Sequence, residues 1–118
     1  MHELSVTENI LNIALRHAEQ AQAEKITDIY LVVGDLSSIV NDSVQFYWDF
    51  ISEETIAEEA TLHFRRIQTE MKCLDCGHLY TPQNDLDCPQ CDSAKVQIIA
   101  GEEFYLEAID VEQEEVLL

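Results

Sequence analysis

Four cysteines in two pairs of equal spacing are the residues best suited to chemistry in this chain. They form Cys73-Leu74-Asp75-Cys76 and Cys88-Pro89-Gln90-Cys91, with eleven residues between the pairs. Two-residue spacing lets a tight turn aim both sulfurs at one point, so two such turns supply four thiolates. Four thiolates complete a tetrahedral zinc site with Zn–S distances of about 2.3 Å and leave no position open for water. The predicted zinc is therefore structural, and another part of the chain must carry the activity.

Other uses of the cysteines are open from spacing alone. Two disulfides would suit a small secreted domain, but Met1-His2-Glu3 lacks the basic and apolar start of a secretory signal. A redox dithiol needs one Cys-x-x-Cys and does not account for two. Iron in a rubredoxin-like site takes the same four ligands, so an electron carrier is an alternative. Colour distinguishes the two, because a tetrathiolate iron site absorbs visible light and a zinc site does not.

The chain is strongly acidic, with 24 Asp and Glu against 6 Lys and Arg and a formal net charge of −18 at pH 7. Phosphate repels such a surface, so nucleic-acid binding is not expected. An acidic surface suits metal cations or a basic protein partner, or serves only to keep the protein soluble. No apolar run approaches the roughly 18 residues of a membrane span, and we expect a cytoplasmic protein.

Helical and strand patterns alternate along the chain. Ser5-Val6-Thr7-Glu8 has the pattern of a capping box, and apolar residues from Ile10 to Ala21 then recur on one helical face. Asn41 and Asp42 are predicted to cap a second helix, which should end near Glu54 because acidic residues there oppose the helix dipole. Its apolar stripe comprises Val44, Tyr47, Trp48 and Ile51. Strands are predicted for residues 26–33, 60–67 and 103–111.

This order predicts an α+β fold, in which a small three-stranded sheet is covered by two helices. The cysteine module is then a zinc-ribbon-like β insertion whose ends lie close together, because the strands that flank it return to one sheet. We expect an α/β domain formed by residues 1–70 and 98–118, and a zinc-binding module formed by residues 71–97. The module is too small to bury enough apolar surface, so its fold should depend on metal. A late third strand could also be exchanged between chains, which leaves a homodimer open.

The amino terminus places several potential metal ligands together. The α-amine, the amide nitrogen of His2 and its imidazole can form fused chelate rings around one metal, and Glu3 could complete a plane through its amide or carboxylate. Ni(II) and Cu(II) favour square-planar ligation, whereas zinc prefers a tetrahedron. An inert, solvated histidine is the alternative that residue types alone leave open.

Three motifs together resemble one known family. Met1-His2-Glu3-Leu4-Ser5, Val33-Gly34-Asp35-Leu36-Ser37 and the paired cysteines, in this order, are similar to the HypA/HybF family of hydrogenase nickel-incorporation proteins over essentially the whole chain. The resemblance implies a nickel metallochaperone. His2 would be the principal ligand of the Ni²⁺ cargo, assisted by Glu3 and by main-chain nitrogens that include the amine of Met1. The four cysteines would hold structural Zn²⁺, and the first of the two domains would be the nickel-binding one.

The resemblance also implies partners. A HypB-type GTPase would act with the chain, with its contacts expected along the first helix, at positions such as Glu8 and Arg16, and at the nickel-bearing terminus. The large subunit of [NiFe]-hydrogenase would receive the nickel. One departure from the family pattern is Asp35, which stands where most members have Glu. A further acidic residue after the serine motif is not evident, so Asp35 and Asp42 are left out of the predicted ligand set.

A zinc-ribbon adaptor that binds other proteins and has an inert amino terminus is the main alternative function. An enzyme is not expected, because the chain lacks a phosphate-binding glycine loop and a nucleophile–base pair. Among the other histidines, His17 and His63 should lie on the surface. His78 follows Cys76-Gly77 and could approach the zinc, although a position that faces solvent or only supports the zinc ligands is favoured. The aromatic residues expected in the core or at an interface are Phe46, Trp48 and Phe50.

Overall fold

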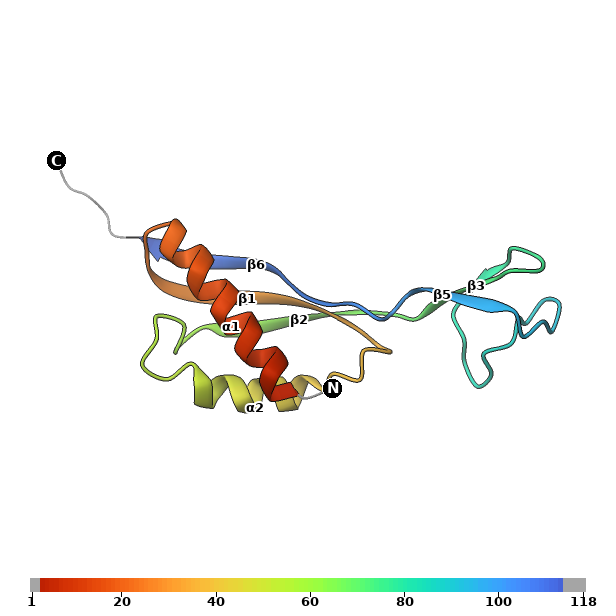
Figure 1. The fold of residues 1–118 in the computed structure, drawn as a ribbon, viewed down its shortest axis with the longest axis horizontal. Helices are drawn as coiled ribbons and strands as arrows, with labels where there is room; N and C mark the ends of the chain where they lie inside the picture. Colours follow the sequence, from red (N-terminus) through yellow and green to blue (C-terminus); the bar gives the residue numbers. More distant parts are fainter. Residues whose placement is uncertain (1–2, 114–118) are drawn as a thin grey trace.

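The computed structural model describes residues 3–113. Along the chain, the elements are α1 (Glu3–Gln20), β1 (Ala23–Gly34), α2 (Asn41–Ile51), β2 (Thr61–Ile67), β3 (Glu70–Cys73), β4 (Leu79–Tyr80), β5 (Val96–Ala100) and β6 (Phe104–Gln113). They form two lobes along the long axis of a molecule that measures 67 × 31 × 17 Å (Figure 1). The main lobe contains α1, α2 and a sheet of order β2-β1-β6, and the cysteine lobe contains a sheet of order β4-β3-β5.

The main sheet is mixed, with β1 at its centre. β1 runs parallel to β2 and antiparallel to β6, so that Ile29 lies between Leu62 on one side and Ile109 on the other. Parallel neighbours need a crossover connection, and α2 supplies it between β1 and β2. The prediction of a three-stranded sheet with two helices is therefore confirmed.

Both helices bury an apolar stripe against one face of this sheet. α1 contributes Ile10, Leu11, Ala14 and Ala18, α2 contributes Val44 and Trp48, and the sheet contributes residues such as Ile29, Leu31 and Val33. Spacings of three and four residues place each helical set on one side of its helix, which is why the sequence pattern identified these residues. Trp48 is 1% exposed and is the largest fully buried side chain.

The ends of the helices differ from the sequence-based expectation. α1 already begins at Glu3, so Ser5 lies within the helix and the predicted capping box is wrong. The Thr7 hydroxyl instead donates a hydrogen bond to the Glu3 carbonyl at 2.6 Å, as serines and threonines within helices often do. The N-cap of α2 is Val40, which forms no side-chain cap, and the predicted caps Asn41 and Asp42 are already helical.

The cysteine lobe is inserted between β2 and β6, and its two ends meet as predicted. Glu70 pairs with Ala100 across the β3–β5 ladder. Beside them, Gly34 at the end of β1 donates its N–H to Glu103 at 2.6 Å, and the Leu36 N–H bonds to the Gly101 carbonyl at 2.7 Å. Three chain segments therefore converge where the lobes join. The division into two domains, with residues 71–97 as the zinc-binding module, stays a prediction.

Neither helix within residues 3–113 combines the length and the apolar character needed to cross a bilayer.

Candidate metal centre

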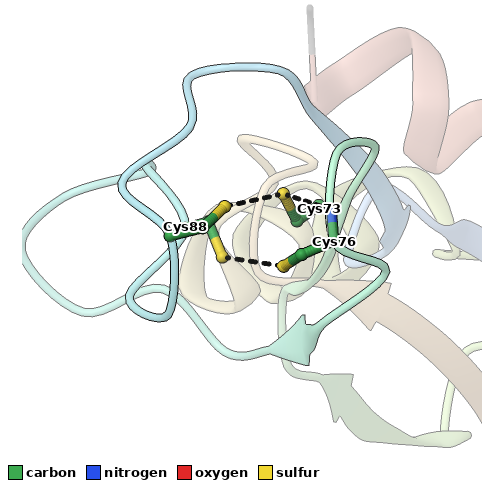
Figure 2. Close-up of side chains that lie close together, drawn as sticks. Cys73, Cys76 and Cys88 are labelled. Atoms are coloured by element: carbon green, nitrogen blue, oxygen red, sulfur yellow. Dashed lines mark hydrogen bonds between the residues drawn. The ribbon is translucent and has the colours of Figure 1, made fainter.

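The four cysteines come together at one point of the cysteine lobe. Their sulfur atoms all lie within 4.8 Å of one another. The Sγ atoms of Cys73 and Cys91 are 3.5 Å apart, and those of Cys76 and Cys88 are 3.7 Å apart (Figure 2). Cys73 and Cys88 are buried, whereas Cys76 and Cys91 are exposed. Each pair therefore presents one sulfur from the interior of the lobe and one from its surface.

Two turns of the same design position these sulfurs. In the first turn, the Gly77 N–H bonds to the Cys73 carbonyl at 2.9 Å, and in the second the Asp92 N–H bonds to the Cys88 carbonyl at 2.8 Å. Gly77 and Asp92 each directly follow the second cysteine of a pair, with left-handed φ angles of 78° and 60°. Glycine tolerates this conformation freely, and aspartate does so better than most residues. Equal spacing in the sequence thus produces equal turns in the structure.

The sulfur geometry fits a tetrahedral metal. Four sulfurs at about 2.3 Å from a central zinc would be separated from one another by roughly 3.8 Å. The Cys73–Cys91 and Cys76–Cys88 separations of 3.5 and 3.7 Å lie close to this value, and all four sulfurs lie within 4.8 Å of one another. Two turns facing one another therefore form a cage of the right size for zinc.

The thiols influence one another's ionisation. Hydrogen bonding from the Cys76 backbone N–H lowers the pKa of Cys73 from 9.0 to about 7. At Cys91, the Ser93 backbone lowers the pKa, but bonding to the Cys73 sulfur and burial outweigh it and raise the value to about 12. Cys73 therefore ionises readily, whereas Cys91 resists ionisation. A divalent cation removes this conflict, because it stabilises all four thiolates at once.

Two of the other histidines lie on the surface, as the sequence predicted, and His78 is half-buried. His17 and His63 are exposed. The ring of His78 stacks on Tyr80 with centroids 5.9 Å apart, while its backbone carbonyl accepts a hydrogen bond from the Cys73 N–H at 2.9 Å. The described contacts of His78 therefore support the turn through the main chain.

The predicted nickel site lies at the edge of the described structure. Met1 and His2 are outside the described residues. Glu3 is the first residue of α1 and is half-buried, and its carbonyl accepts the Thr7 hydroxyl. The helix thus holds the main chain of Glu3, and its side chain is partly open to solvent.

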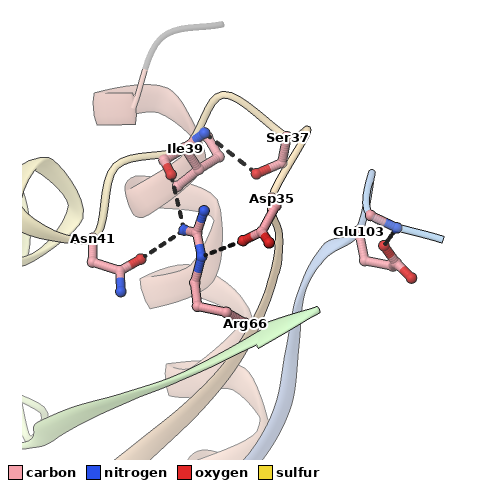
Figure 3. A network of polar contacts seen from close by, with 7 residues as sticks. Asp35, Ser37, Ile39, Asn41, Arg66 and Glu103 are labelled. Atoms are coloured by element: carbon pink, nitrogen blue, oxygen red, sulfur yellow. Dashed lines mark hydrogen bonds and ion pairs between the residues drawn. The ribbon is translucent and has the colours of Figure 1, made fainter. Parts of the chain in front are cut away.

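Arg66 holds the loop that carries the Val33-Gly34-Asp35-Leu36-Ser37 motif. No pattern in the sequence indicated this contact. Its guanidinium donates from Nε to the Asp35 carboxylate at 3.2 Å and from Nη1 to the Ile39 carbonyl at 3.2 Å and the Asn41 side chain at 3.0 Å (Figure 3). The carboxylate of Asp35 is therefore engaged within the main lobe, where it fixes the loop between β1 and α2. Arg66 lies 31 residues from Asp35, and only the parallel pairing of β1 with β2 brings them together.

Comparison with known proteins decides the family. The family model described as "Hydrogenase/urease nickel incorporation, metallochaperone, hypA" matches residues 1–111. The chain belongs to the HypA family. A hydrogenase maturation factor HypA from Dehalococcoides mccartyi is 44% identical over 115 residues, which cover 97% of each chain. Another, from Caldanaerobacter subterraneus, is 40% identical over 114 residues, or 95% of this chain and 100% of that protein.

Solved HypA structures have the same fold. The solution structure of the Ni metallochaperone HypA from Helicobacter pylori is 30% identical, with a TM-score of 0.65, and the match covers 97% of this chain and 100% of that one. A second solution structure of a HypA protein gives a TM-score of 0.72 at 27% identity, over 97% of this chain and 98% of that one. The α+β fold of this chain is thus shared with both HypA structures over 97% of its length.

Proposed function

We propose that this chain is a nickel metallochaperone that binds Ni(II) at its amino terminus and delivers it to the large subunit of [NiFe]-hydrogenase. The observation that carries the proposal is the family match over residues 1–111, a range that includes the Met1-His2-Glu3 start. The related Helicobacter pylori protein is a Ni metallochaperone, which supports the same cargo. A carrier must release its ion to a recipient, so a site that is open to solvent would suit this role.

In the proposed site, His2 supplies its imidazole and its amide nitrogen, Met1 supplies the α-amine, and Glu3 supplies its amide or carboxylate. Fused chelate rings of this kind favour a planar d⁸ ion over zinc. A HypB-type GTPase is the proposed partner for nickel insertion, with contacts along α1, where Glu8 and Arg16 are exposed. The chain itself would act as a carrier, not as an enzyme, in the cytoplasm.

The cysteine cage is proposed to hold structural zinc through Cys73, Cys76, Cys88 and Cys91. The sulfur separations support this assignment, and four thiolates leave no open position for a reacting ligand. Zinc there would hold the two turns together and so maintain the shape of the cysteine lobe.

Nickel titration of the zinc-loaded protein, followed by electronic absorption, tests the proposed site. We expect planar Ni(II) binding by the wild type, and its loss both in His2→Ala and after addition of two residues before Met1, because the extension removes the amine and the fused rings. Glu3→Gln should have a smaller effect, since its amide survives. Zinc content should not change in any variant.

Two outcomes would contradict the proposal. Unchanged nickel affinity and spectrum in the extended protein would show that the amine is no ligand, and a site made of side chains alone would have to replace it. If the wild type bound no nickel at the terminus, the chain would fit a zinc-ribbon adaptor instead.

A further inference from the structure

Helix α2 exposes two large aromatic side chains to solvent. Phe46 and Phe50 are 69% and 72% exposed. Each follows a buried residue, Val44 or Trp48, by two positions. Two residues correspond to about 200° around a helix of 3.6 residues per turn, so both phenyl rings point away from the protein's own core. They stand one turn apart and form a ridge, which we call the Phe46–Phe50 ridge.

The ridge lies in an acidic surrounding. Asp42 and Asp49 flank it on α2, and Glu53 follows in the turn beyond the helix; all three are exposed. The Asp49 carboxylate accepts a hydrogen bond from the Gln45 side chain at 2.8 Å. Residues 26–64 contain eight Asp and Glu residues and no Lys or Arg. Arg66 is a residue of β2 whose side chain reaches the start of α2, and its guanidinium is already paired with Asp35.

We infer that the Phe46–Phe50 ridge is a docking surface for a protein partner that presents an apolar groove bordered by lysine and arginine. Exposed apolar side chains at a spacing of four residues on one helix are the anchors by which helices bind in grooves. Exposed clusters of large apolar residues with a polar rim mark interaction surfaces. This inference rests on the proposed function, because a metal carrier must contact the proteins that load it or receive its cargo.

Charge argues for a different protein rather than a second copy of this chain. Packing two α2 helices against each other would bring Asp42, Asp49 and Glu53 of both copies together, and like charges across an interface cost free energy. The same groups on a basic partner would instead speed association and select the partner. The acidic rim therefore identifies the occupant as cationic.

The position of the ridge suits transfer of a metal. α1 packs against α2, and in Figure 1 the two helices begin at the same end of the main lobe. Glu3, in the proposed nickel site, is the first residue of α1. Phe46 and Phe50 lie in the middle and near the far end of α2, so a partner that covers the length of this helix would also reach the end of the lobe where cargo is proposed to bind.

The double variant Phe46→Ser/Phe50→Ser tests the ridge. Its probes are two purified proteins from the same organism, the HypB-type GTPase and the metal-free large subunit of [NiFe]-hydrogenase, with Kd measured by calorimetry. We expect at least one of them to bind the variant about tenfold or more weakly, the loss typical of aromatic anchors. Ile99→Ser, which alters an exposed apolar residue on β5 (46% exposed), is the matched control and should bind as wild type.

A charge variant keeps the test independent of the aromatic residues. Asp49→Lys/Glu53→Lys should weaken the same complex, and it should remove most of the salt dependence of the association rate. Lysine near the carboxyl end of a helix suits the helix dipole, so the fold should tolerate this change. Far-ultraviolet circular dichroism and nickel titration check that both variants fold and carry cargo.

The inference would be overturned if both probes bound the serine variant with wild-type affinity. It would also be overturned if the wild type bound neither probe. Self-association of the wild type that is lost in the serine variant would also overturn it, in favour of a second copy as the occupant. If the chain bound no nickel but the ridge was still needed for a partner, the proposed function would fail and the docking surface would stand.

Discussion

Polar side chains on the open face of the main sheet form a connected chain of contacts around Tyr30. Its hydroxyl donates a hydrogen bond to the Asp110 carboxylate at 2.7 Å, and its ring stacks on His63 with centroids 4.7 Å apart. His63 Nε2 lies 2.8 Å from the Asp28 carboxylate. The three strands of the sheet are thus linked on this face by side chains as well as by the backbone.

This arrangement makes the ionisation of Tyr30 sensitive to its neighbour. The hydrogen bond to Asp110, followed by burial, raises the pKa of Tyr30 from its ordinary 10.0 to about 12. Because the folded pKa lies above the unfolded one, the stabilisation is complete below pH 10 and is lost as the pH rises from about 10 to about 12. An absorbance titration of the tyrosines should show a late-ionising group that is absent in Tyr30→Phe. In Asp110→Asn, the pKa of Tyr30 should move back towards 10. An unchanged titration curve in this variant would refute the explanation.

The positions of some residues could be predicted from the sequence, whereas the contacts of others could not. The cysteine pairs could be placed because each turn is local, and His63 because strand alternation puts it opposite Leu62 and Phe64. The partners of Tyr30 and Arg66 could not be predicted. Tyr30 and Asp110 are 80 residues apart, and their contact depends on a β1–β6 register that contains irregularities. Phe46 and Phe50 were expected in a core or an interface, and the structure excludes the protein's own core.

Three chain segments pack closely against one another at Gly34, where β1 ends. A Cβ atom added to Gly34 would lie 2.7 Å from the Glu103 nitrogen and closer still to the Gly101 carbonyl. These are backbone atoms of the segment that returns from the cysteine lobe to β6, so they cannot move aside as a side chain could. The glycine in the Val33-Gly34-Asp35-Leu36-Ser37 motif is therefore required by close packing of the main chain.

Gly34→Ala should destabilise the main lobe by roughly 1–3 kcal/mol or more, the usual cost of overpacking a rigid site. Emission from Trp48, the one tryptophan in the sequence, follows unfolding of this lobe in urea. Gly77→Ala is the control, since nothing lies within 4 Å of its added Cβ atom and its cost arises from the φ angle of 78° alone. If Gly34→Ala and the wild type unfolded at the same urea concentration, the three chain segments would be able to move apart at Gly34 without loss of stability, and this explanation would be wrong.

The elements themselves were largely predictable, whereas their ends were not. Apolar periodicity identified both helices and the three strands of the main sheet, because it reflects the side that each element buries. Helix starts depend on a few local hydrogen bonds, and here Thr7 bonds back to Glu3 while Val40 forms no side-chain cap. Capping patterns in the sequence therefore pointed to the wrong residues at both helices.

The whole molecule is too extended to share one core. Its radius of gyration is 18.9 Å, whereas a compact domain of this length would measure about 13.5 Å. The residues of the main hydrophobic cluster all come from the main lobe. In the cysteine lobe, the buried side chains are Met71, Cys73 and Cys88. That lobe therefore depends on the proposed metal in place of an apolar core.

Removal of one ligand should then unfold one lobe and spare the other. In Cys76→Ser the cage is incomplete, and amide protons between Met71 and Val96 should lose most of their protection from hydrogen exchange, as they should in the wild type after chelation. The melting midpoint reported by Trp48 should shift by less than about 4 °C, which corresponds to roughly 1 kcal/mol in a domain of this size.

Gln90→Ala is the control, because it alters an exposed residue between two of the cysteines. This variant should keep both the bound metal and the protection of the amides. Equal amide protection with and without metal would show that the lobe folds unaided, and a matching loss of the Trp48 signal would show that the two lobes unfold as one.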